Sequence, residues 1–196
     1  ETYCGQPCIR LAIGDGDSAL VALHGAQVLS WVSGGRERLY LSPKAVFDGQ
    51  AAIRGGIPLC FPQFNQRGPL PKHGFARNLA WRTDGAQAGE GVTRLSLHLT
   101  DDERSRVWWP QAFAVRLDVV LSEGQLQVEC AVRNTGAGIT GSTGGNGQTP
   151  GLVLLGETAM PMSGVTFAAH LAARLGREAM LVGDAGYGTI FLVLIV

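Results

Sequence analysis

The most constraining feature of the sequence is a period-two alternation of apolar residues from Phe113 to Val132. Apolar side chains occupy every second position on both sides of the turn at residues 122–124. Successive side chains of a strand point to opposite faces, so the pattern predicts an antiparallel hairpin with one buried face. Shorter apolar runs elsewhere alternate in the same way between turn residues, at positions 9–13, 19–23, 27–32 and 92–99. The sequence therefore predicts an all-β fold, an antiparallel β-sandwich, without a convincing amphipathic helix before residue 165. The acidic residues 101–103 are expected in a solvated loop.

Residues 51–81 form a segment of a different kind. They include four Gly, four Pro and four cationic side chains, and no acidic residue. Gly and Pro at this density prevent a regular helix or central strand, so we expect a shaped loop. Arg54 and Arg77 bracket the segment, and Lys72 and His73 are adjacent within it. These charges favour an anionic small ligand, a phosphate or a carboxylate, although a solvated loop without a function has the same composition.

Composition excludes several classes of protein. Of the 196 residues, 45% are apolar and 16% are charged, which is typical of a globular chain. Sixteen basic and sixteen acidic residues give no reason to expect nucleic acid or an anionic membrane as a partner. No apolar run reaches the roughly 18 residues of a membrane helix, and nothing near Glu1 is typical of a signal peptide. Because Glu1 is not Met, we expect the true N-terminus to be missing or processed.

The cysteines indicate free thiols in a cytoplasmic protein. Cys4 and Cys8 have the spacing of a metal-binding pair, but no second pair or nearby His completes a zinc site. We therefore predict that the chain holds no metal. We also expect it to be a monomer.

The composition changes after Gly136. Residues 137–196 contain 12 Gly and only five charged side chains. We therefore predict a β-sandwich region at 1–136, a Gly-rich linker or insertion at 137–165, and a separate C-terminal segment at 166–196. The apolar run from Thr189 to Val196 indicates either a buried strand or an aggregation-prone tail.

Two motifs in the central loop resemble those of a known enzyme family. The first reads RGGIP and continues through CFPQF, over residues 54–64, and the second reads HGFARN, over residues 73–78, with Trp81 shortly after. Both are similar to motifs of the D-hexose-6-phosphate mutarotases, also called glucose-6-phosphate 1-epimerases, of the aldose 1-epimerase superfamily. The hairpin ending at residues 133–136 is similar as well. The resemblance covers residues 9–136 and implies a galactose mutarotase-like supersandwich, incomplete at its C-terminus. It implies an enzyme that interconverts the α and β anomers of a hexose 6-phosphate without a cofactor.

The resemblance also implies roles for single residues. Arg54 and Arg77 are expected to bind substrate, as is Lys72, which stands where the family usually has Gln. Lysine cannot accept a hydrogen bond, so the sugar specificity stays open. His73 is expected either to line the site or to be a structural histidine that the loop backbone satisfies.

The catalytic pair is less complete in the sequence. His170, with Arg174 four residues later, is similar to the family's general-acid motif, but the same stretch is also typical of a short helix. The resemblance places the family's general-base Glu and a substrate-binding Asp beyond the last residue of this chain.

Two other functions fit the sequence. One is a catalytically inactive β-sandwich remnant that binds sugar phosphates. The other is a carbohydrate-binding module that stacks neutral glycans on tryptophans, with Trp31, Trp81, Trp108 and Trp109 as candidates.

Overall fold

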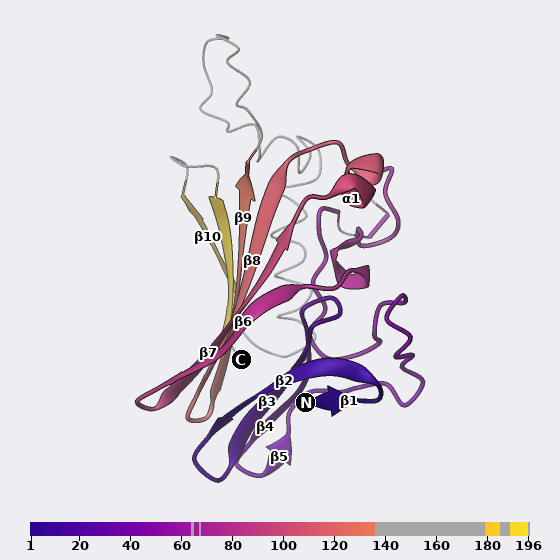
Figure 1. The fold of residues 1–196 in the computed structure, drawn as a ribbon. Coiled ribbons are helices and arrows are strands. Elements are labelled where there is room, and N and C mark those ends of the chain that lie inside the picture. Colours follow the sequence, from indigo (N-terminus) through magenta and orange to yellow (C-terminus); the bar gives the residue numbers. More distant parts are fainter. Residues whose placement is uncertain (64, 67, 136–178, 185–188, 196) are drawn as a thin grey trace.

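The structure is a computed structural model that describes residues 1–63, 65–66, 68–135, 179–184 and 189–195. Within these residues the chain forms two antiparallel sheets, with short helical elements and long loops beside one end of the pair (Figure 1). The predicted all-β, antiparallel fold class is confirmed. No helix in this part of the chain is long and apolar enough to cross a membrane.

The first sheet is a five-stranded meander in which each strand pairs with the next one in sequence. Its strands are β1 (Thr2–Tyr3), β2 (Gln6–Ile13), β3 (Asp17–Ala22), β4 (Gln27–Ser33) and β5 (Arg36–Glu37), in the order β1-β2-β3-β4-β5. The longer strands β2, β3 and β4 coincide with the apolar runs of the sequence, and short turns join the strands. This is the connection that antiparallel neighbours require.

The second sheet has six strands among the described residues, in the order β10-β11-β9-β8-β7-β6. They are β6 (Arg82–Gly89), β7 (Val92–Thr100), β8 (Phe113–Ser122), β9 (Gln125–Asn134), β10 (Ala179–Asp184) and β11 (Thr189–Ile195). Strands β8 and β9 pair from Phe113↔Asn134 to Ser122↔Gln125, so the predicted hairpin is confirmed. The apolar run near the end of the sequence forms β11, which pairs antiparallel with β9.

One apolar cluster fills the space between the two sheets. From the second sheet it includes Leu95, Leu97, Leu117, Val119 and Leu126, and from the first sheet Leu11, Val21, Val28 and Trp31. Each fully buried side chain of this size contributes roughly 1.5–3 kcal/mol through its removal from water. The alternation seen in the sequence therefore places one face of each sheet against the other.

The outer face of the first sheet is also covered. Leu20 and Leu29, which point away from the other sheet, pack with Ile53 and with the partly buried Leu41 and Phe47. Residues 41–53 thus cross the back of this sheet, and the last three of them are already part of the 51–81 loop. Strand β3 is buried on both faces for this reason.

Two features of the second sheet differ from the sequence-based expectation. Of the acidic residues 101–103, expected in a solvated loop, Asp101 and Asp102 do lie outside regular structure, whereas Glu103 is the first residue of helix α1 (Glu103–Trp108). Asp102 accepts a hydrogen bond from the Ser105 backbone N–H at 2.7 Å, and Ser105 Oγ accepts one from the Asp102 N–H at 2.8 Å. This reciprocal capping box stabilises a helix that lacks an amphipathic pattern. Strand β6 was not expected, because its sequence contains few apolar residues.

Candidate functional site

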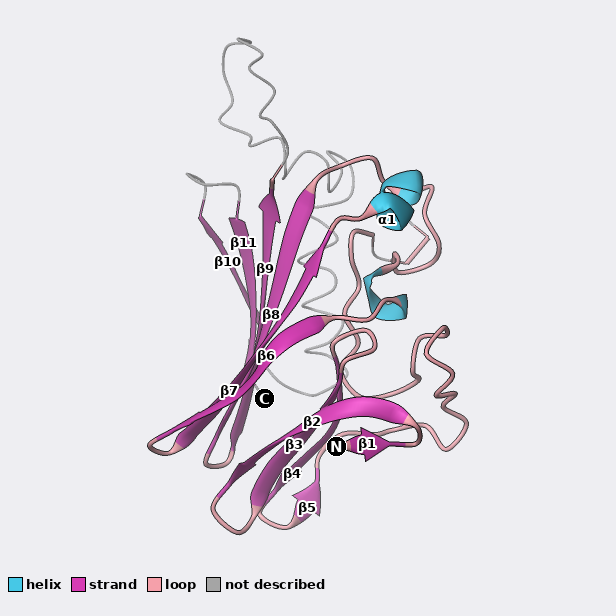
Figure 2. Cartoon of the chain, viewed as in Figure 1, coloured by secondary structure: helices cyan, strands magenta, loops and turns pink. Residues whose placement is uncertain are grey.

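The 51–81 segment is a loop, as predicted. Its one regular element among the described residues is the 3-10 helix η1 (Ala76–Asn78). The loop passes the end of the first sheet at which β3 turns into β4 (Figure 2). Isolated bridges attach it there, and they pair His24 with Ala80 and Val28 with Ile57. Both arginine segments of the loop are therefore anchored to the same end of this sheet.

Two glycines after Arg54 allow the loop backbone to touch its neighbours. A Cβ atom at Gly55 would lie 2.5 Å from the Tyr40 carbonyl oxygen, and one at Gly56 would collide with the Val28 carbonyl oxygen. Both glycines also have positive φ angles, of 110° and 60°. The Gly-Gly pair of the motif is therefore explained by packing and conformation.

Gln27, at the start of β4, holds the backbone on both sides of Arg54. Its side chain is fully buried, and its Nε2 donates to the carbonyl oxygens of Ile53 at 2.9 Å and Gly55 at 2.5 Å. The Arg54 carbonyl oxygen accepts a third bond, from the Ser42 N–H at 3.0 Å. The exposed Arg54 side chain thus projects from a fixed backbone. Sequence reasoning missed Gln27, for which the only signal was a polar residue at a strand start.

Arg77 is anchored by the β3–β4 turn. A Cβ atom at Gly25 would lie 2.7 Å from the Arg77 carbonyl oxygen, and the Gly25 N–H donates to the Leu79 carbonyl oxygen at 2.7 Å. The guanidinium Nη2 donates to the Lys72 carbonyl oxygen at 2.7 Å. The Nε of Arg77 is buried and has no partner among the described residues.

His73 lies in the same part of the loop, beside Cys60. The His73 residue has a φ of 69°, and its Nδ1 accepts a hydrogen bond from the Asn65 backbone N–H at 3.1 Å. Cys60 Sγ lies 3.3 Å from the same nitrogen. Burial raises the pKa of the Cys60 thiol to about 11, against a smaller opposing effect of the Arg77 charge, so the thiol is neutral at pH 7.

The structure thus brings together three of the predicted site residues, Lys72, His73 and Arg77, and anchors Arg54 to the same turn region. The Lys72 side chain is exposed, and its carbonyl group contacts Arg77. His170 lies outside the described residues. No group of three or more His, Cys, Asp or Glu side chains within the described ranges is placed to hold a metal.

An aromatic cluster supports the loop from below. Phe61 and Phe75, from the two motifs, contact each other edge to face at 6.3 Å between ring centroids. Phe113 of β8 and Trp109, which follows α1, pack against Phe61 at 5.2 and 5.5 Å. The cluster joins the loop to the second sheet and excludes water beneath it.

Burial excludes two of the four tryptophans that the sequence offered as a stacking platform. Trp31 and Trp81 are buried in the core, at 2% and 3% exposure, so neither can stack on a glycan. Trp108 is more exposed, at 43%, but its ring lies against Phe75 at 5.6 Å. Large aromatic residues are more often packed against other side chains than exposed, and these three follow that tendency.

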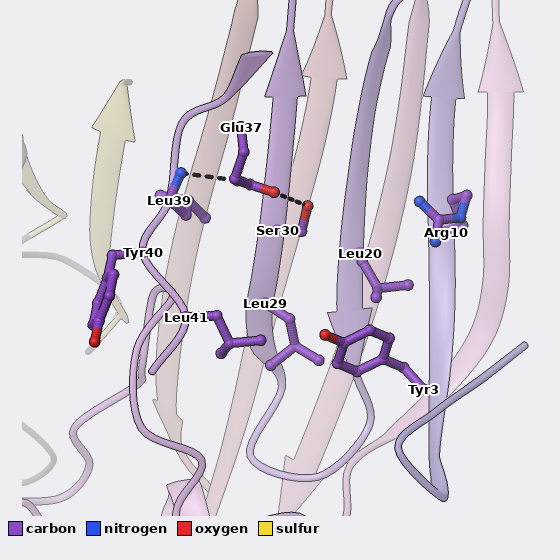
Figure 3. A pocket seen from close by; sticks show the side chains of 9 residues that line it. All are labelled: Tyr3, Arg10, Leu20, Leu29, Ser30, Glu37, Leu39, Tyr40 and Leu41. Carbon is purple, nitrogen blue, oxygen red and sulfur yellow. Dashed lines mark hydrogen bonds between the residues drawn. The ribbon is translucent and has the colours of Figure 1, made fainter. Parts of the chain in front are cut away.

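A groove on the outer face of the first sheet is separate from these residues. It has a volume of about 380 Å³, and none of the predicted site residues lines it. In Figure 3, Leu29 and Leu41 lie between the rings of Tyr3 and Tyr40. Its carboxylate, Glu37, accepts hydrogen bonds from the Leu39 N–H at 2.9 Å and from the Ser30 hydroxyl.

Comparison with known proteins gives consistent matches. A family model described as aldose 1-epimerase matches residues 7–143. The chain is 42% identical over 124 residues to a protein of Cenchrus ciliaris named "Putative glucose-6-phosphate 1-epimerase". Its structure is similar to that of a "putative mutarotase (YeaD)" from Salmonella typhimurium, with a TM-score of 0.57 and 29% identity over 65% of this chain. A galactose mutarotase related enzyme from Lactobacillus acidophilus shares the fold, with a TM-score of 0.52 and 19% identity over 72% of this chain.

The chain spans about half the length of these relatives or less. The matched segment covers 38% of the Cenchrus protein, 50% of the Salmonella structure and 51% of the Lactobacillus structure. The predicted galactose mutarotase-like arrangement of two antiparallel sheets is confirmed by these structures. The roles of Arg54, Lys72, His73, Arg77 and His170 stay predictions.

Proposed function

The chain belongs to the aldose 1-epimerase family, and from that membership we propose that it interconverts the α and β anomers of a hexose 6-phosphate. The observation that carries the proposal is the cationic loop at the β3–β4 turn. Arg54, Lys72 and Arg77 lie in a segment without an acidic residue, and the segment is anchored by backbone contacts to one sheet end. The relative in Cenchrus, which shares 42% identity, is named for this reaction.

The phosphate group is the part of such a substrate that this loop is best suited to hold. Arg54 and Arg77 each carry a guanidinium, which matches phosphate geometry in a bidentate manner. Lys72 contributes a compact point charge, which suits a phosphate oxygen or donates to a sugar hydroxyl. Arg54 projects from a backbone fixed by Gln27, so little conformational entropy is lost from its main chain on binding.

Anomer exchange then needs one acid and one base. The base removes the proton of the C1 hydroxyl while the acid protonates the ring oxygen, and the C1–O5 bond breaks to give the open-chain aldehyde. Rotation about the C1–C2 bond followed by the reverse steps closes the ring to the other anomer. A positioned acid or base contributes about 10²–10⁴-fold to such a rate. We assign the acid to His170 by its motif.

A sugar-phosphate-binding protein without catalytic activity is the alternative. Arg54, Lys72 and Arg77 are among the described residues, so the proposed phosphate contacts do not involve His170. Catalysis requires His170 and a base in addition. Binding and exchange are therefore measured separately.

The binding test compares two arginine variants. We expect Arg54→Ala to weaken binding of glucose 6-phosphate about 10- to 100-fold, the loss typical of a charge-assisted hydrogen bond, and to change binding of glucose much less. Isothermal titration calorimetry with both ligands measures this. Arg36→Ala, which removes an exposed arginine from β5, is the matched control and is expected to change neither affinity. Equal losses for both sugars in Arg54→Ala would contradict the phosphate assignment.

The activity test measures exchange between the anomers of glucose 6-phosphate directly. NMR saturation transfer gives this rate with and without the protein, in buffer that does not itself catalyse exchange. Faster exchange with the protein supports the mutarotase function. Binding without faster exchange would support the inactive alternative, and the absence of both would contradict the two proposals together.

A further inference from the structure

His73 is held in one hydrogen-bonding arrangement by the segment just before it. The His73 N–H donates to the Asn65 carbonyl oxygen at 2.9 Å, and the Asn65 N–H donates to His73 Nδ1 at 3.1 Å. The two residues therefore bind each other through a reciprocal pair of bonds. Both have positive φ angles, of 69° for His73 and 54° for Asn65, so the pair depends on an unusual backbone conformation.

This arrangement decides where the imidazole proton lies. A backbone N–H only donates, so the ring nitrogen that faces Asn65 must be unprotonated, and the neutral ring must carry its hydrogen on Nε2. Cys60 is compatible with this choice, because its pKa of about 11 leaves a protonated thiol 3.3 Å from Nδ1 that can donate to it. A proton on Nδ1 would face the Asn65 N–H, which can only donate. The loop thus selects the Nε2–H tautomer of His73.

Gln63 holds the backbone that makes this selection. Its side chain is 7% exposed, and its Nε2 donates to the carbonyl oxygens of Asn65 at 2.9 Å and Leu70 at 3.1 Å. Its Oε1 accepts from the Leu70 N–H at 3.0 Å. One amide therefore closes the loop between residues 63 and 70, and Gly68 lies so close to it that a Cβ atom there would collide with Oε1.

We propose that Gln63 is a positioning residue that acts through Asn65 to keep His73 in the Nε2–H tautomer, so that His73 serves the bound sugar phosphate as a hydrogen-bond donor. The proposal rests on the proposed function for the identity of the ligand. Its structural part is independent of the ligand. In this arrangement neither ring nitrogen of His73 removes a proton from the sugar, because Nδ1 is engaged by Asn65 and Nε2 is protonated. The base of the reaction is therefore a group other than His73.

The first test determines the tautomer in the free protein. In the ¹⁵N-labelled chain at pH 8, above the usual imidazole pKa of about 6.5, long-range ¹H–¹⁵N spectra distinguish a protonated from an unprotonated ring nitrogen. The His73→Gln variant assigns the signals among the four histidines. We expect His73 to show an unprotonated Nδ1 and a protonated Nε2. The opposite pattern, or an equal mixture, would overturn the proposal.

The second test removes the amide. Gln63→Met preserves the side-chain length and the net charge but deletes all three hydrogen bonds, and Gln87→Met does the same at an exposed position of β6 as a matched control. We expect Gln63→Met to give a mixture of His73 tautomers. We also expect it to lower the affinity for glucose 6-phosphate by a factor of about five or more, which corresponds to the loss of roughly one hydrogen bond to the ligand. The control is expected to match the unmodified chain.

The outcomes separate this proposal from the proposed function. An unchanged His73 tautomer in folded Gln63→Met would overturn the role of Gln63, whatever the ligand. Gln63→Glu, which retains only the acceptor for Leu70, decides the same question if the methionine variant does not fold. Absence of glucose 6-phosphate binding in the unmodified chain would contradict the proposed function, and the tautomer measurements would still decide the positioning role.

Discussion

Glycines determine the path of the loop at the scale of single residues. Gly74 follows His73 and has a φ of 72°, and a Cβ atom there would collide with the Phe61 carbonyl oxygen. Gly74 and Phe61 form a parallel bridge that joins the two sequence motifs. The sequence indicates that the glycines of the loop form turns, but the backbone group that each glycine contacts is visible only in the structure.

Substitution of Gly74 tests this close approach. We expect Gly74→Ala to lower the free energy of unfolding by more than about 3 kcal/mol, because it combines a positive φ with a backbone collision. Gly91→Ala is the matched control, since Gly91 has a φ of 66° but no atom within 4 Å of its Cβ position. The control is expected to cost about 1–2 kcal/mol. Urea unfolding followed by circular dichroism measures both, and equal losses would show that the loop moves away without cost.

At the scale of elements, the sequence predicts the strands that have one apolar face, and it does not predict a strand whose faces are both largely polar. Strands β7, β8 and β9 alternate over most of their length, because every second side chain enters the core. Strand β6 is an edge strand with mostly exposed side chains, so burial does not impose a pattern on it. Helix α1 depends on the capping box of Asp102 and Ser105, a local signal that the acidic run obscured.

Strand β4 also holds part of the candidate site in place, because Gln27 at its start binds the backbone on both sides of Arg54. We expect Gln27→Leu to leave the carbonyl groups of Ile53 and Gly55 without their buried partner and to lower stability by about 1–3 kcal/mol. We also expect weaker binding of glucose 6-phosphate, because the Arg54 backbone lies between those two carbonyl groups. Calorimetric titration and urea unfolding measure the two effects.

Gln6→Leu is the matched control for this variant. Gln6 also donates from a strand to a loop carbonyl, that of Phe47 at 3.0 Å, but it does not contact the Arg54 segment. We expect it to lower stability without changing the affinity. An equal loss of affinity in both variants would show that Gln27 acts on stability alone.

At the scale of the whole molecule, the two sheets share one core. Leu97 lies in it without exposed surface, in a cluster that also contains Val21 and Trp31 of the first sheet. Removal of a side chain from this cluster therefore weakens both sheets together.

We expect Leu97→Ala to lower the free energy of unfolding by about 2–5 kcal/mol, through lost burial and the cavity left behind. Val107→Ala, at 81% exposure in α1, is expected to change it by less than about 0.5 kcal/mol. Tryptophan fluorescence and far-ultraviolet circular dichroism should report the same urea midpoint in each variant. Different midpoints for the two probes would show that the sheets unfold separately.

The second sheet contains strands from two of the three predicted parts of the chain. The described residues of the 1–136 region form all of the first sheet and four strands of the second. Strands β10 and β11, from the predicted C-terminal segment, complete the second sheet among the described residues. The Gly-rich segment 137–165 and His170 lie outside the described residues. Their assignment as a linker and as the general acid stays a prediction.

The sequence by itself determined the fold class, the hairpin and the location of the cationic loop. Strand alternation and the density of Gly and Pro are local properties that burial and backbone geometry impose on neighbouring residues. Only the tertiary structure decided how the loop is held. Gln27 contacts residues 26 and 28 positions later in the chain, and Gln63 and Asn65 orient His73 through the loop backbone. Such contacts carry no periodic signal, because the N–H groups of a buried amide bind whichever carbonyl group the fold brings within reach.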